Sequence, residues 1–109
     1  MQTLIKENTG LNERDIFTII SILKKYPEIK EVLLFGSRAK GNYKKGSDID
    51  LVIMKNNISE EVLIKIKNEF EESDIPYFVD LINYNTLSHK KLREHIQRVG
   101  VLFYKSDEL

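Results

Sequence analysis

The chain has 109 residues, in which 17 Lys and Arg balance 17 Asp and Glu, and it has no cysteine. This length suits one domain, spanning residues 1–109, with one site. The balanced charge counts against a dedicated nucleic-acid-binding protein, and the lack of cysteine excludes disulfides and thiolate chemistry. Residues 1–7 lack a basic stretch leading into an apolar one, and no apolar run reaches the length of a membrane span, so we expect a soluble cytoplasmic protein.

The first predicted elements are a helix over residues 11–26 and a strand over residues 31–35. In the helix, apolar side chains recur at helical spacing after Asn12, a typical N-cap residue, and Pro27 ends the pattern. The following EVLLF is short, apolar and rich in strand-forming residues, and it stops at Gly36. We therefore expect this strand to be buried.

A short helix or turn over residues 37–40 and a polar loop over residues 41–47 lead to a second strand, residues 48–54. Because side chains alternate between the two faces of a strand, Asp48 and Asp50 point the same way at its leading end. Their Cα atoms are then roughly 6.6 Å apart. Carboxylates at this separation can converge on one Mg²⁺ ion or bridge two.

The second half of the chain continues the alternation of helices and strands. Ser59 is a typical N-cap, and the apolar positions after it recur at helical spacing until Pro76 closes the segment. Residues 77–82 predict a third strand, residues 88–98 a polar helix and residues 101–104 a fourth strand. The two histidines of the polar helix, six residues apart, do not share a stripe, and we expect both to be exposed.

This order predicts an α/β fold, a small sheet of about four strands with helices packed on it. The connection between the first two strands is too short for a crossover helix, so we expect a mixed sheet rather than a parallel one. Function must come from the site rather than from this architecture.

A third acid, Asp80, interrupts the apolar third strand, where a charge is costly unless it is paired, metal-bound or exposed at an edge. It is the candidate to complete a two-metal site with Asp48 and Asp50, since such sites clamp the attacking and leaving oxygens of an in-line displacement. The turn at Gly36 and Ser37 can offer backbone N–H groups to a phosphate. An Asp-x-Asp or Gly-Ser pair alone has little specificity. The two pairs together at these positions, Gly36 and Ser37 with Asp48 and Asp50, favour a functional site.

Four basic side chains around the loop could neutralise a triphosphate. Arg38 is the better candidate because it directly follows the turn, whereas for Lys44 and Lys45 a solvated loop is an equal alternative.

The run GSRAKG at residues 36–41, followed by SDIDL at residues 47–51, resembles the signature of the minimal nucleotidyltransferases (MNT) of the polymerase-beta-like superfamily. Residues 77–82 supply the third acid where that family has it, and residues 96–104 resemble its closing helix and strand. Lys40 stands where relatives often have Arg.

The resemblance implies a polymerase-beta palm-like fold and transfer of a nucleoside monophosphate from a triphosphate such as ATP, with release of pyrophosphate. In that reading Gly36, Ser37 and Arg38 bind the nucleotide. The acids Asp48, Asp50 and Asp80 are both catalytic residues and ligands of two Mg²⁺ ions.

The resemblance also implies a partner, because such proteins are commonly encoded beside a small HEPN ribonuclease with which they form a type VII toxin–antitoxin pair. Our first hypothesis is a protein adenylyltransferase that attaches AMP to a tyrosine of the HEPN toxin, in a hetero-oligomer with it. The alternatives are an antitoxin that acts by binding alone, and nucleotidyl transfer to RNA or to a small hydroxyl compound.

Overall fold

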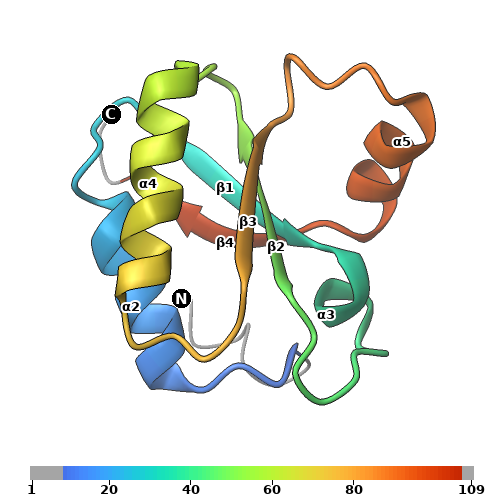
Figure 1. Ribbon diagram of the computed structural model, residues 1–109. Helices are drawn as coiled ribbons and strands as arrows, with labels where there is room; N and C mark the ends of the chain where they lie inside the picture. The colour runs from blue at the N-terminus through green and yellow to red at the C-terminus, as the bar shows by residue number, and fades with distance from the viewer. Residues whose placement is uncertain (1–8, 107–109) are drawn as a thin grey trace.

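Four strands form one sheet in the order β3-β2-β1-β4 within residues 9–106, the part of the chain that the computed structural model describes (Figure 1). Strand β1 pairs antiparallel with both β2 and β4, and β2 pairs parallel with β3. The expected mixed α/β sheet is therefore confirmed. The strands are β1 (Glu31–Phe35), β2 (Ile49–Met54), β3 (Val79–Asn83) and β4 (Val101–Lys105). Residues 1–7, on which the expected lack of a leader depends, lie outside the described part.

In this part of the chain, α2 (Glu13–Leu23) precedes β1, and the helices α3 (Gly36–Lys40), α4 (Glu60–Glu72) and α5 (Lys90–Val99) join successive strands. Side chains cap the three longer ones, as the sequence predicts for Asn12, which accepts from the Asp15 N–H, and for Ser59, which accepts from the Val62 N–H. The first helix ends earlier than predicted, because the chain tightens into turns between Leu23 and Pro27. Strand β3 also begins later than predicted, at Val79.

Helices α2 and α4 cover one face of the sheet (Figure 1). The apolar face of α4 and the odd-numbered residues of β2 and β3 meet there in the main core, which includes Leu63, Ile66, Phe70, Ile49, Leu51, Ile53, Val79 and Leu81. Most of these side chains are almost completely buried. The main core therefore holds the helical layer and the sheet together on this side.

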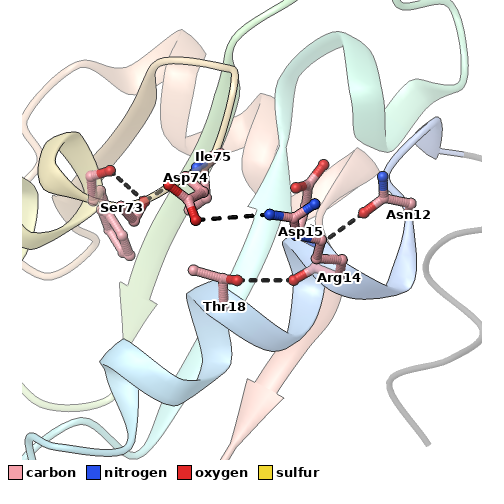
Figure 2. Close-up of polar contacts among 8 residues, drawn as sticks. Asn12, Arg14, Asp15, Thr18, Ser73, Asp74 and Ile75 are labelled. Carbon is pink, nitrogen blue, oxygen red and sulfur yellow. Dashed lines mark hydrogen bonds and ion pairs between the residues drawn. The ribbon is translucent and has the colours of Figure 1, made fainter.

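Polar contacts also link the start of α2 to the segment that follows α4 (Figure 2). Arg14 Nη2 lies 3.7 Å from Asp74 Oδ2, and both side chains are largely exposed. Ser73 Oγ donates to the Phe70 carbonyl oxygen at 2.6 Å and accepts from the Ile75 N–H. An exposed ion pair contributes little to stability, so these contacts shape the connection more than they stabilise it.

Helix α5 covers the opposite face, beside α3. Only a small apolar cluster lies under it, in which Ile96 packs with Phe35, Val52 and Tyr84. Polar contacts add to this packing, because Arg93 Nη1 donates to the Tyr84 carbonyl oxygen at 3.0 Å and the guanidinium lies 4.3 Å from the Tyr84 ring centroid. No helix in residues 9–106 is both long and apolar enough to span a bilayer.

Candidate functional site

The turn between β1 and α3 is built around a glycine that no other residue can replace without strain. Gly36 has a φ of +78°, and a Cβ at this position would overlap Asp50 Oδ2. The backbone of the turn thus lies directly against the carboxylate of the neighbouring strand. The two halves of the sequence pattern, glycine turn and paired aspartates, meet in space.

The register of the parallel pair brings the second and third acids together. Asp50 of β2 is the direct partner of Asp80 of β3, so the two side chains lie on the same face of the sheet, the one covered by α5. Asp48 precedes β2 instead of beginning it, and its side chain is exposed. The structure therefore places Asp50 and Asp80 side by side, with Asp48 at the open end.

Burial raises the pKa of the Asp50 carboxyl group above its usual value, and the negative charges of Asp80 and then Asp48 raise it further. Lys67 of α4 reaches Asp80, with its Nζ 3.6 Å from Asp80 Oδ1. The carboxylates thus repel one another, and one lysine offsets part of that charge.

Oxygen donors of this kind suit Mg²⁺, although residues 9–106 contain no group of three or more acidic, histidine or cysteine side chains placed to hold a metal. Mg²⁺ commonly binds through one or two carboxylates together with substrate phosphates and water. The Asp50 and Asp80 pair, whose charges disfavour each other, fits that pattern.

A pocket of about 360 Å³ opens beside the glycine turn. It is lined by Gly36, Ser37, Lys40, Asn42, Lys44, Ser47 and His95. The two lysines give it a positive charge, and the Ser37 and Ser47 hydroxyl groups offer hydrogen bonds. The pocket thus has the chemistry of an anion site next to the acids.

The nucleotide contact that the sequence predicts for Arg38 stays a prediction, and the structure shows the contacts that this side chain makes within the fold. Its side chain is only 2% exposed, and its guanidinium donates to the Thr9 carbonyl oxygen at 2.7 Å and to the Ser47 carbonyl oxygen at 2.9 and 3.1 Å. It also stacks on Tyr77 and Tyr43, with its Cζ 4.4 and 5.1 Å from the ring centroids. Through its hydrogen bonds to the Ser47 carbonyl oxygen, Arg38 holds the loop that leads to Asp48.

The sequence-based expectation that His95 is an exposed helix residue is wrong. Its side chain is partly buried in the pocket wall, and Nε2 accepts the Gly36 N–H at 3.2 Å. A signal was available, because His95 lies three residues after Leu92, whose side chain packs against the small cluster under α5, and so shares the inward face of the helix. Lys67 was also missed, and no sequence pattern pointed to it.

The chain belongs to the polymerase beta nucleotidyltransferase family. The family model described as "Polymerase beta, Nucleotidyltransferase" matches residues 18–109. A curated relative from Haemophilus influenzae, "Probable protein adenylyltransferase MntA", is 36% identical over 103 residues, which cover 90% of this chain and 86% of the relative.

Solved structures with the same fold come from toxin–antitoxin complexes. One, described as a toxin–antitoxin with AMP-PNP, has a TM-score of 0.67 at 20% identity and covers 89% of this chain and 76% of its own. Another is a tri-AMPylated Shewanella oneidensis HEPN toxin in complex with MNT antitoxin. It has a TM-score of 0.63 at 18% identity and covers 97% of this chain and 74% of its own. These likenesses confirm the expected nucleotidyltransferase fold.

Proposed function

We propose that this protein transfers AMP from ATP to a hydroxyl group, with a tyrosine of a partner HEPN toxin as the acceptor. By doing so it acts as the antitoxin of the pair, in a hetero-oligomer with the toxin in the cytoplasm. The observation that carries the proposal is the pairing of Asp50 with Asp80 beside the Gly36 turn. The named function of the curated relative and the partners of the solved complexes support the same class of acceptor.

The pocket beside the glycine turn is the proposed place of the triphosphate. Ser37 and the backbone N–H groups of the turn other than that of Gly36, which His95 accepts, bind the β- and γ-phosphates, and Lys40 and Lys44 offset their negative charge. A triphosphate bound there would have its α-phosphate near the acids, because Gly36 lines the pocket and also lies against the Asp50 carboxylate.

The carboxylates of Asp48, Asp50 and Asp80 are the proposed ligands of two Mg²⁺ ions. When bound, the metal would neutralise charge on the triphosphate and polarise the α-phosphate. Burial first, and then the negative charges of Asp80 and Asp48, raise the pKa of Asp50, and a bound cation would relieve the repulsion among these carboxylates.

In the transfer step, the acceptor hydroxyl oxygen forms a bond to the α-phosphorus. The bond from the α-phosphorus to the bridging oxygen of the β-phosphate breaks, and pyrophosphate leaves with that electron pair. The hydroxyl proton passes to the carboxylate of Asp80, which lies at the sheet edge where an acceptor can approach.

The experiment that tests this proposal incubates the purified protein with ATP, Mg²⁺ and the HEPN toxin proposed as its partner, and then weighs both proteins by intact mass spectrometry. We expect an increment of one or more AMP groups on the HEPN protein, and none when the magnesium is chelated. Neutralisation of the toxin without any increment would favour an antitoxin that acts by binding alone. An increment found only on RNA or on a small hydroxyl compound would change the acceptor.

A further inference from the structure

The imidazole of His95 lies against the glycine turn, 59 positions away along the chain. Nε2 accepts the Gly36 N–H at 3.2 Å, and the ring meets Phe35 edge-on, with centroids 6.3 Å apart and planes at 79°. These two contacts fix the ring at the point where β1 passes into α3. Helix α5 is thereby tied to the turn through one side chain.

Gly36 lies between this imidazole and a carboxylate. His95 holds its N–H, and Asp50 Oδ2 occupies the space where a side chain would be. The backbone of the preceding residue, Phe35, pairs with Asp50 in the β1–β2 ladder, and the His95 contact adds a side-chain restraint to the turn that follows it. A movement of the turn would change the distance between the pocket and the Asp50 carboxylate.

We propose that His95 is a positioning residue of this site, which holds the Gly36 turn against Asp50 by accepting the Gly36 N–H. The role in catalysis rests on the proposed function, because that function supplies what the turn and Asp50 bind. His95 also lines the pocket, so its ring limits the space on the α5 side. A misplacement of about 1 Å at such a site can reduce a rate about 100-fold.

The contact requires a neutral imidazole with its hydrogen on Nδ1, because a protonated ring has no acceptor. Burial lowers the pKa of His95 below its usual value of 6.5, and the positive charges of Arg98 and Lys40 lower it further. The charged groups around the ring and the turn are Arg98 of α5, Lys40 of α3, Lys44 of the pocket loop and Asp50 of β2. The contact is therefore intact at neutral pH and is lost on acidification below 6.5.

A glutamine at this position separates hydrogen-bond acceptance from titration. In His95→Gln the amide oxygen reaches about as far as Nε2 and accepts at every pH, whereas His95→Ala removes the acceptor. His89→Asn is the matched control. His89 caps α5 by accepting the Leu92 N–H through Nδ1, and an asparagine oxygen can replace that contact without touching the turn.

The first measurement follows the Gly36 backbone amide by ¹H–¹⁵N NMR during a pH titration of the free protein. In the wild type and in His89→Asn we expect its shift to change with a midpoint below 6.5. In His95→Gln that step should be absent. The titration of Asp50 is common to all three proteins, so the difference isolates His95. An identical step in His95→Gln would overturn the contact.

The second measurement is AMP transfer to the HEPN partner, with ATP binding measured separately. At neutral pH we expect His95→Ala to lower kcat about 10-fold or more and His95→Gln to keep most of the wild-type kcat. In the wild type, kcat should fall as the pH drops below 6.5 and the contact is lost, and His95→Gln should lack this fall. Equal activity of His95→Ala and the wild type would overturn the proposal, as would equal losses in the two variants. If the wild type neither binds ATP nor transfers AMP, the proposed function fails, and the NMR titration still decides the contact by itself.

Discussion

The two faces of the sheet differ in what they contain. Under α2 and α4 lies a continuous apolar core in which Ile19, Leu23, Ile66 and Leu81 have no exposed surface. Under α5 lies a cluster of four buried residues, and beside it the same face carries the carboxylates of Asp50 and Asp80. The two faces therefore have different roles in one small domain. The first face stabilises the fold, and the second holds like charges close together at a cost in stability.

The difference between the two faces follows from the alternation of side chains along β2. Ile49, Leu51 and Ile53 face the main core, whereas Asp50 faces α5. A strand with period two can therefore contribute to the core and to the site with adjacent residues.

The largest effect should come from neutralising the acid at the centre of the second face. Asp50→Asn should lower AMP transfer on the order of 10²–10³-fold, because a proposed ligand of the magnesium that offsets the charge of the reacting phosphate is lost. The raised pKa means that the charged Asp50 opposes folding: stability falls as pH rises from 3.8 through the folded-state pKa, and the full cost is present at neutral pH. The same variant should therefore melt at a higher temperature than the wild type at neutral pH.

Calorimetric melting at neutral pH, with and without Mg²⁺, checks this prediction. Mg²⁺ should raise the melting temperature of the wild type more than that of Asp50→Asn. Asp74→Asn, a change at a largely exposed acid in the α2–α4 contact, should alter neither activity nor melting. A destabilised Asp50→Asn protein would contradict the proposed cost of the acid pair.

Removing a large side chain from the first face should affect stability and leave the chemistry of the site intact. Ile66→Ala should lower the free energy of unfolding by about 2–5 kcal/mol, since a fully buried side chain is replaced by a cavity. Ile64→Ala on the same helix, at a side chain that is 53% exposed, should stay within about 0.5 kcal/mol. Urea unfolding measures both, and equal losses would show that α4 does not bury the face described here.

A substitution of Arg38 that keeps its positive charge distinguishes a role in folding stability from a role in ATP binding. Arg38→Lys leaves at least one of the Thr9 and Ser47 carbonyl oxygens without its donor, which should cost about 1–3 kcal/mol. ATP affinity, measured by calorimetry below the melting temperature, should fall by less than about threefold, or 0.6 kcal/mol. A tenfold loss of affinity with unchanged stability would assign Arg38 to the nucleotide site.

The smallest effect concerns the hydrogen bond from the Tyr26 hydroxyl to Glu69, on the first face. This bond, burial and the charge of Glu69 raise the pKa of Tyr26 to about 12. Tyr26→Phe should cost about 1–2 kcal/mol at neutral pH. Because the folded-state pKa lies above the unfolded value of 10.0, the advantage of the wild type should disappear as pH rises from 10.0 to about 12. Urea unfolding across that range checks this, and a constant difference would contradict it.

Sequence patterns predicted the strands and the pairing of glycine turn and acids because both depend on local spacing. The single charge in the apolar β3 was enough to name Asp80 as the candidate third acid, whereas its place beside Asp50 depends on the register of β2 and β3. The roles of Arg38 and His95 could not be predicted in the same way. They depend on partners distant in the chain, Thr9 and Gly36, whose positions only the packing of the loop and of α5 determines.

The central claim is that the face under α5 binds ATP through the acid pair and a divalent cation. Isothermal titration of a non-hydrolysable ATP analogue into the wild type and into Asp50→Asn, each with Mg²⁺ and with a chelator, tests it most directly. We expect saturable binding to the wild type that requires Mg²⁺ and is lost or strongly weakened in Asp50→Asn. Equal binding in both proteins, or binding to the wild type that is unchanged by the chelator, would contradict it.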